Sequence, residues 1–310
     1  MSAHADIDTK HSSADNVLTS SEDISDLSIV LPAKNEAESL QKLIPKIKEL
    51  FGDAEIIVVD DGSTDSTAEI CARNGVQRYF HRHSRGNGAA IKTGARLAQG
   101  SRIVFMDADS QHDPNNIHKL LRQYDEGADM VVGERSASGH AGVCRRIANG
   151  FYNRFASWIS GRTIADLTSG FRVVNAKKFR EFLHLLPNGF SYPTTITMAF
   201  LRTGYEVEFV PVEVHNRIGT SHVRIVRDGI RFLLIIFKIG TLYSPLKIFL
   251  PVSALFFCTG LGYYLYTYFT VGRFTNMSAL FFINSVLIFL IGLVSEQITA
   301  LTYSRSDHES

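Results

Sequence analysis

Two long runs without charged residues occupy the C-terminal part of this chain. No charged residue lies between Lys247 and Arg273, and none lies between Arg273 and Glu296. Each run is long enough to supply the roughly 20 apolar residues with which a helix crosses about 30 Å of hydrocarbon. The turn between the runs is too short for anything except a tight hairpin. We therefore predict a two-helix transmembrane hairpin with spans at about 248–270 and 276–300.

Other features of these runs favour a membrane location. Four tyrosines crowd one end of the first run, as in the aromatic belts at bilayer interfaces: Tyr263, Tyr264, Tyr266 and Tyr268. Two buried helices of a soluble domain are the alternative. Basic residues are abundant before the hairpin and nearly absent from its turn, which predicts that the preceding domain and both termini are cytoplasmic.

A basic amphipathic segment precedes the hairpin. Arg224, Arg227, Arg231 and Lys238 share one helical face about 60° wide at 100° per residue, and apolar residues fill the remainder. This pattern is typical of a helix that lies in a membrane interface, although a charged face on an ordinary soluble helix is the alternative. We predict interfacial helices over residues 223–246.

The rest of the chain divides by composition. Residues 1–25 are rich in Ser, Asp and His without periodicity, which predicts a disordered tail. We expect one catalytic domain at 26–222, the hairpin at 247–303 and a cytoplasmic tail at 304–310. The net charge of +1 argues against a general nucleic-acid-binding protein. The three cysteines are far apart, which fits a reducing compartment. Because the N-terminal residues contain no apolar segment, we expect no cleavable signal peptide.

Short apolar runs alternate with helical patterns through the predicted catalytic domain. Strands are predicted at about 27–31, 55–59, 78–80, 103–106 and 130–132, near Val173, and at 206–214. Helical patterns cover about 40–50, 86–97, 117–124, 145–159 and 176–186. Thr64 or Asp65 is expected to cap a further helix after the second strand. The alternation predicts an α/β fold with a mostly parallel sheet and helices on both faces.

The strand at 103–106 runs directly into two carboxylates, Asp107 and Asp109. Ligands of open α/β sheets bind at the edge where parallel strands end. In a turning backbone both carboxylates could reach one hard cation, and a divalent metal there could hold a diphosphate. A solvated turn with helix-capping acids is the alternative, and the spacing alone leaves both open.

Three further polar clusters follow predicted strands, at 32–36, 60–63 and 133–135. Carboxylates gathered along one edge repel each other, and a bound metal and a nucleotide ribose would offset that repulsion. Gly86-Asn87-Gly88 superficially matches a dinucleotide fingerprint. However, Ile91 stands at the third glycine position and the motif lies in a late βα unit, so a nicotinamide enzyme is disfavoured.

Five motifs together resemble the inverting family 2 glycosyltransferases, which have the GT-A fold of nucleotide-diphospho-sugar transferases. The motifs are Leu31–Glu36, Val58–Asp65, Arg85–Ala90, Met106–His112 and Ser169–Arg172. The chain is most similar to the polyprenyl-phosphate branch, which includes dolichyl-phosphate mannose synthase and bacterial undecaprenyl-phosphate glycosyltransferases. The resemblance extends from about residue 26 through the hairpin. It implies transfer of a hexose from a GDP- or UDP-linked sugar to a polyprenyl monophosphate at the cytoplasmic membrane face.

The resemblance also implies roles for individual residues. The nucleotide sugar would be bound by Pro32, Ala33, Asn35, Glu36, Asp60, Asp61, Gly88, Lys92, Asp107 and Ala108. A divalent cation, Mg²⁺ or Mn²⁺, would be held by Asp107, Asp109 and Gln111. The catalytic residues would be Asp109 and Asp166, although a capping role is the alternative for Asp166. The acceptor phosphate would be bound by Arg135, Arg145 or Arg146, Arg217 and Ser221.

The family's phosphate-contacting loop often ends in Ser-Lys, whereas this chain has His222 there, so that a positive charge at this position depends on pH.

Three other functions are compatible with parts of the sequence. A processive polysaccharide synthase shares the sheet and the acids, but its Gln-x-x-Arg-Trp motif is not matched around Trp158. A nonenzymatic membrane scaffold would not need both Asp107 and Asp109. A soluble-acceptor transferase with an incidental anchor is the third. Association of the hairpins into a homo-oligomer is compatible with the sequence.

Overall fold

The computed structural model describes residues 26–135, 143–189, 191–214, 234, 237, 240–241 and 244–306, with the backbone alone at 143–149 and 302–306. The predicted tail at 1–25 and most of the predicted interfacial segment at 223–246 lie outside these residues.

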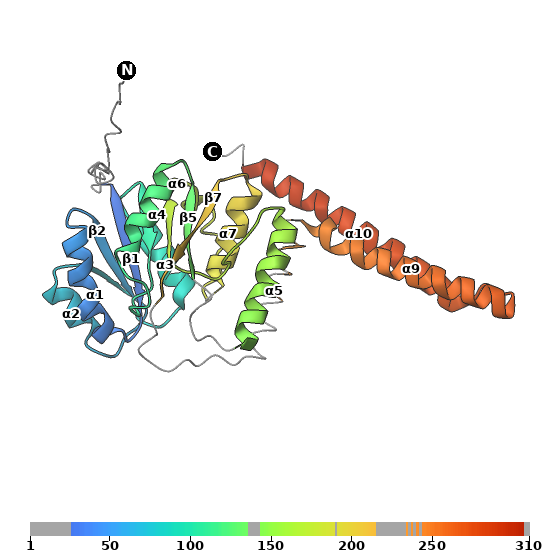
Figure 1. Cartoon of the computed structure of the whole chain (residues 1–310), viewed down its shortest axis with the longest axis horizontal. Helices are drawn as coiled ribbons and strands as arrows, with labels where there is room; N and C mark the ends of the chain where they lie inside the picture. The colour runs from blue at the N-terminus through green and yellow to red at the C-terminus, as the bar shows by residue number, and fades with distance from the viewer. Residues whose placement is uncertain are drawn as a thin grey trace, which may run out of the picture.

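Seven strands form one sheet in the order β3-β2-β1-β4-β6-β5-β7 (Figure 1). The strands are β1 Leu27–Ala33, β2 Glu55–Asp60, β3 Gln77–Phe80, β4 Arg102–Phe105, β5 Met130–Arg135, β6 Arg172–Asn175 and β7 Val207–Val212. β6 pairs antiparallel with both β4 and β5, whereas the other strand pairs of the sheet are parallel. The predicted mostly parallel sheet is confirmed.

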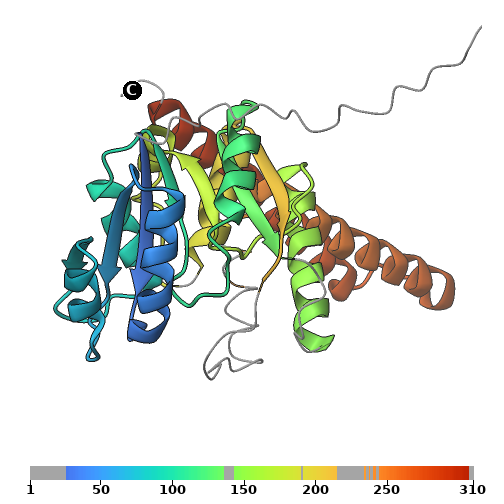
Figure 2. The same cartoon turned by 60° about the vertical axis from the view of Figure 1, so that its left-hand side comes forward.

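Helices cover both faces of the sheet, as predicted (Figure 2). They are α1 Ala37–Leu50, α2 Thr67–Arg73, α3 Asn87–Leu97, α4 Asn116–Asp125, α5 Val143–Ser160, α6 Ala176–Glu181 and α7 Tyr192–Arg202. α1, α2 and α4 share one apolar core with the sheet, and α3, α5, α6 and α7 share the other. The N-cap residue of α2 is Ser66 rather than Thr64 or Asp65, although Asp65 Oδ1 accepts a hydrogen bond from Thr67 N (3.1 Å) in the first turn.

The sequence patterns fail to predict α7 and misplace the end of α6. Every residue from Tyr192 to Phe200 is buried, so α7 lacks the alternation of apolar and polar faces by which a surface helix is recognised. The helical pattern through Leu186 is wrong beyond Glu181. From there the chain continues in tighter turns, in which Leu185 N donates to Phe182 O.

Two apolar helices, α9 Pro245–Val271 and α10 Asn276–Ser306, form a hairpin that extends away from the sheet (Figure 1). Both are long and apolar enough to cross a membrane. Ser253 and Ser285 face each other inside the hairpin and each hydroxyl donates to the other residue's carbonyl oxygen. Large side chains point outward instead, with Leu255 65% and Phe269 81% exposed. Such a surface suits hydrocarbon, and the predicted two-helix hairpin is confirmed.

His112 is a core residue in the segment that follows β4. Its ring stacks on Phe171 with the centroids 4.7 Å apart, and its backbone forms an isolated β-bridge with Val214. Burial, and secondly the charge of Arg135, lower the pKa of His112 to about 4. The imidazole is therefore neutral at physiological pH and packs as an aromatic ring.

We predict that His112 makes the folded state less stable in acid. Between pH 6.5 and 4 the unfolded ring binds a proton that the folded ring does not. The contribution of His112 to the free energy of unfolding is therefore fully present above pH 6.5, and it falls by about 3 kcal/mol as the pH is lowered towards 4. Thermal unfolding of the full chain in detergent across this pH range should show a shallower pH dependence for His112→Phe. The same substitution at exposed His83 is the control, and an unchanged slope in His112→Phe would contradict the prediction.

A glycine sets how closely α3 packs on β1. A Cβ at Gly94 would lie 2.2 Å from Val30 Cγ1, whereas a Cβ at Gly150 in α5 would meet nothing within 4 Å. We expect Gly94→Ala to destabilise the fold by about 1–3 kcal/mol through overpacking. Gly150→Ala should stabilise it by up to about 1 kcal/mol through helix propensity. Thermal unfolding of both variants provides the comparison, and a shift in the same direction would refute the packing argument.

Candidate functional site

The polar clusters predicted from the sequence converge on one edge of the sheet. β1 pairs in parallel with β2 on one side and with β4 on the other, so that all three strands end at this edge. The strand order reverses between β1 and β4, because the chain continues from β1 to β2 and later returns to form β4. Ligands of open α/β sheets bind at such a reversal. The candidate site therefore lies between residues 34–36 and 106–111.

The segment after β4 makes a tight turn that carries both predicted metal-binding acids. Ser110 adopts a left-handed conformation with φ of 58°, which is uncommon for a residue other than glycine. Asp109 Oδ1 accepts a hydrogen bond from Gln111 N (3.1 Å). Asp107 and Asp109 are half-buried, and Ala108 between them is buried. The turn therefore holds two carboxylates and the amide side chain of Gln111 in one short segment.

Asp107 lies between the start of α3 and the loop before β6. Asn87 Nδ2 donates to Asp107 Oδ1 at 3.4 Å, and a Cβ at Gly170 would lie 3.0 Å from Asp107 Oδ2. The hydroxyl of Tyr192, the first residue of α7, donates to Gly170 O (3.3 Å). Burial, and secondly the charge of Asp107, raise the pKa of Tyr192, so this phenol stays protonated. A side chain at position 170 would therefore press on the Asp107 carboxylate and the Tyr192 hydroxyl.

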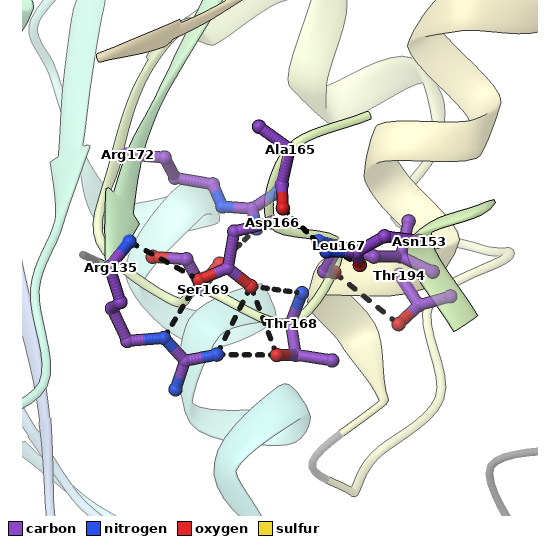
Figure 3. A network of polar contacts seen from close by, with 9 residues as sticks. All are labelled: Arg135, Asn153, Ala165, Asp166, Leu167, Thr168, Ser169, Arg172 and Thr194. Carbon is purple, nitrogen blue, oxygen red and sulfur yellow. Dashed lines mark hydrogen bonds and ion pairs between the residues drawn. The ribbon is translucent and has the colours of Figure 1, made fainter. Parts of the chain in front are cut away.

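Asp166 and Arg135, which the sequence analysis placed in the site separately, are bonded to each other (Figure 3). Arg135 Nε lies 2.8 Å from Asp166 Oδ2, and Arg135 Nη2 lies 3.1 Å from Oδ1. Asp166 Oδ1 also accepts from Thr168 N (3.0 Å), so this carboxylate caps its own turn as well. Burial raises the pKa of Asp166, but the hydrogen bonds from Arg135 and Thr168 outweigh it and hold the pKa below its usual value.

Arg172 is fully buried beneath this loop, at the start of β6. Its guanidinium donates to Ser169 O, to Pro193 O (3.4 Å) and to Thr197 Oγ1 (3.2 Å). It also lies 5.8 Å from the centroid of the Tyr192 ring. A buried cation is costly unless oxygen atoms or opposite charges surround it. Arg172 therefore joins the loop at 165–170 to α7.

Asp60 and Asp61, at the end of β2, organise the neighbouring loops. The buried Asp60 carboxylate accepts from Arg78 Nη2 (2.7 Å) and from Ser63 N (2.8 Å). Burial alone would raise the pKa of Asp61, but four hydrogen bonds to its carboxylate outweigh this effect and lower the pKa to about 2. These bonds come from His81 Nδ1, Ser84 Oγ, Arg85 N and Gly86 N, all at 2.7–2.8 Å. Both acids thus shape the edge of the site.

The end of β1 is clasped to the loop after β2. Pro32 and Ala33 are buried in the strand, and Asn35 has a left-handed φ of 56°. Asn35 N donates to Ser63 Oγ (2.9 Å), and Asn35 Oδ1 accepts from Thr64 N (2.8 Å). A cavity of about 400 Å³ opens beside this clasp and is lined by Asn35, Glu36, Ala37, Glu38, Ser39, Gln41, Asp65, Ser66 and Ile70. It does not include the acids that follow β4.

The glycine motif at the start of α3 contacts the loop at 186–189. A Cβ at Gly88 would lie 2.1 Å from Pro187 O, so only glycine fits there. Lys92 Nζ donates to Leu186 O (3.0 Å) and to Asn188 Oδ1 (2.5 Å). Sequence patterns gave no sign of these contacts, because the partners lie almost a hundred residues away.

The structure thus brings the predicted residues from β1, β2, β4 and β5 to one edge. The side chains of Arg145 and Arg146, and the residues Arg217, Ser221 and His222, lie outside the described part of the chain. The sequence analysis assigned no role to Asn87, Ser169, Arg172 or Tyr192. The motif Ser169–Arg172 was the available signal for two of them, and Asn87 stands in the glycine motif.

Comparison with known proteins supports this architecture. Residues 28–183 match the model of the glycosyl transferase family 2, and residues 244–301 match the model of the GtrB C-terminal hairpin. Glycosyltransferase AglJ of Haloferax volcanii is 28% identical over 77% of this chain and 80% of its own length. Polyprenol monophosphomannose synthase of Mycolicibacterium smegmatis is 29% identical over 62% and 79%. Dolichyl-phosphate hexose transferase of Haloferax volcanii is 29% identical over 63% and 86%.

A solved structure shares the fold. Glucosyl-3-phosphoglycerate synthase from Mycobacterium tuberculosis, in complex with Mn²⁺, UDP and glucosyl-3-phosphoglycerate, superposes with a TM-score of 0.55 and 22% identity. The match covers 68% of this chain and 79% of that one. Because the family model spans residues 28–183, this chain belongs to glycosyl transferase family 2, and it carries a C-terminal hairpin of the GtrB type.

Proposed function

We propose that this chain is an inverting, metal-dependent glycosyltransferase that moves a hexose from a nucleotide-diphosphate sugar to a polyprenyl monophosphate. The observation that carries the proposal is the combination, in one chain, of a family 2 domain with acids at its ligand edge and an apolar hairpin beside it. Two of the relatives above are named for polyprenol or dolichyl-phosphate acceptors. The hairpin anchors the chain in a membrane, and the catalytic domain faces the cytoplasm in this proposal.

The donor set at the end of β4 fits a hard divalent cation. Asp107, Asp109 and Gln111 offer carboxylate and amide oxygens, the ligands that Mg²⁺ and Mn²⁺ prefer. The side-chain oxygens Asn87 Oδ1 and Ser110 Oγ are buried near this turn without a hydrogen-bond partner among the described residues. A bound cation would neutralise charge on the diphosphate leaving group. In the part of the chain described, no three His, Cys, Asp or Glu side chains gather into a metal site.

With a monophosphate acceptor, the reaction needs positive charge near the phosphate more than it needs a general base. A monophosphate with a second pKa near 6 is largely dianionic at neutral pH and is already a nucleophile. Arg135, whose side chain is 37% exposed at the rim, would bind this phosphate, while Asp166 holds the guanidinium in a fixed orientation. Arg145 or Arg146, Arg217 and Ser221 complete the proposed phosphate site. Fixed charges of this kind align the two anions for in-line attack at the anomeric carbon.

The nucleotide is proposed to lie along the ends of β1 and β2. Asn35, Glu36 and Asp61 stand at this edge, with Pro32 and Ala33 forming its floor. Asp60 and Lys92 are bonded to Arg78 and to the loop at 186–189, so they would act by fixing the loops around the donor rather than by direct contact. Gly88, which packs against Pro187 O, would fix the start of α3 beside the donor, and the buried Ala108 would fix the turn between the two acids.

A donor screen tests the proposed function. The full chain in detergent is incubated with GDP- and UDP-linked sugars and a polyprenyl phosphate, in the presence of Mg²⁺ or Mn²⁺. We expect sugar transfer to the lipid from at least one donor, loss of transfer with EDTA, and recovery when metal is added in excess. Transfer to a water-soluble acceptor but never to polyprenyl phosphate would contradict the acceptor assignment.

The acid turn provides a second test. We expect Asp109→Asn to lower kcat by at least about a hundredfold, because it removes one of two charges that hold the cation near the diphosphate. Asp125→Asn, at a half-exposed position at the end of α4, is the control and should leave kcat unchanged. Turnover is measured with the donor and metal found in the screen. Activity like that of the unmodified chain in Asp109→Asn would remove the metal from the mechanism.

A further inference from the structure

The base of the hairpin is bonded to the catalytic domain by side chains of both hairpin helices. Glu296 of α10 accepts a hydrogen bond from Leu246 N in the first turn of α9 (3.1 Å). The other carboxylate oxygen of Glu296 lies 3.7 Å from Arg202 Nη2, on the last residue of α7. Lys247 Nζ donates to Ile159 O near the end of α5 (2.9 Å). The hairpin is therefore docked on two helices of the domain rather than joined to it by the chain alone.

The same two helices hold the loop that contains Asp166. At the start of α7, the Tyr192 hydroxyl donates to Gly170 O (3.3 Å). On α5, Asn153 Oδ1 accepts from Leu167 N (3.2 Å), and Asn153 Nδ2 donates to Ala165 O. Figure 3 shows Asn153 beside this loop. The loop at 165–170 is thus bonded near both ends to helices that also carry the contacts with the hairpin base.

The chemistry of Glu296 fits a positioning role. It follows a stretch of the helix without charged residues from 277 to 295, and an ionised carboxylate at the edge of hydrocarbon is costly unless it is paired. The backbone N–H of Leu246 lies at the positive end of α9, which favours a negative partner. Arg202 and Glu296 are 40% and 31% exposed at their side chains, so water still reaches the pair.

We propose that Arg202 and Glu296 are positioning residues for the acceptor reaction, because their ion pair fixes the depth at which the hairpin holds the loop at 165–170 relative to the bilayer. A flexible tether would keep the domain at the membrane without setting this depth. The inference rests on the proposed function, since it requires that the acceptor phosphate is presented at the membrane surface. Arg202 and Glu296 are not among the residues proposed to bind the donor, the cation or the acceptor, so they would act through the loop.

The test compares two acceptors with variants of the full chain. Glu296→Gln keeps an oxygen for Leu246 N but loses the ion pair, and Arg202→Gln loses the pair from the other side. For a long-chain polyprenyl phosphate in a bilayer we expect kcat/KM to fall about three- to tenfold, while a short, water-soluble isoprenyl phosphate in detergent changes by less than about twofold. The charge-swapped double variant Arg202→Glu with Glu296→Arg should recover only part of the loss, because arginine at position 296 cannot accept the hydrogen bond from Leu246 N.

Glu69→Gln and Arg73→Gln provide the matched control, because they break an Arg–Glu pair of similar length (3.8 Å) on α2, away from the hairpin. A second readout needs no substrate. Amide hydrogen exchange at residues 165–170 should rise in Glu296→Gln and stay unchanged in Glu69→Gln. Equal loss with both acceptors, or unchanged exchange at 165–170, would overturn the inference. If the unmodified chain glycosylates only soluble acceptors, the proposed function fails, and the exchange result still decides whether the pair positions the loop.

Discussion

The parallel pairing of β1 with β2 and β4 determines where everything else in the site can lie. Three strand ends at one edge place the acids of two segments, 60–61 and 107–109, at the ends of β2 and β4, the two strands that flank β1. Such a concentration of negative charge is unfavourable in an apolar fold. The carboxylates are stable at this edge because cations and hydrogen-bond donors surround them. The strand pairing that creates the edge therefore also requires cations and N–H groups close to it.

Those donors come from segments far apart in the sequence. Arg78 of β3 neutralises Asp60, four hydrogen bonds fix Asp61, and Arg135 of β5 holds Asp166. The buried Arg172 adds a positive charge beneath the loop at 165–170. On the turn after β4, Asp107 accepts a hydrogen bond from Asn87 Nδ2 and Asp109 accepts one from Gln111 N, and the positive charges of Arg135 and Arg172 also act on Asp107.

Much of the fold and the location of the site were predictable from the sequence. The apolar runs that end in Asp60 and Asp107 mark buried strands, and parallel topology brings their ends together. The uncharged runs predict the hairpin for an equally simple reason. What could not be predicted are contacts without a local pattern. α7 is buried on all sides and lacks a helical period, and Lys92 and Gly88 pack on a loop nearly a hundred residues away.

Because contacts between distant segments leave no local pattern, motifs assign a role to each residue separately and do not show which residues are bonded to each other. The resemblance placed Asp166 and Arg135 in the site as separate agents, whereas the structure joins them as one bidentate pair. A carboxylate bonded to a guanidinium partly neutralises its positive charge, but it also fixes the orientation of the guanidinium before any ligand binds. In the proposed function, the acceptor phosphate would bind the N–H groups of Arg135 that Asp166 and Thr168 do not use. In the proposed function, this fixed orientation would lower the entropic cost of binding the acceptor phosphate at the rim.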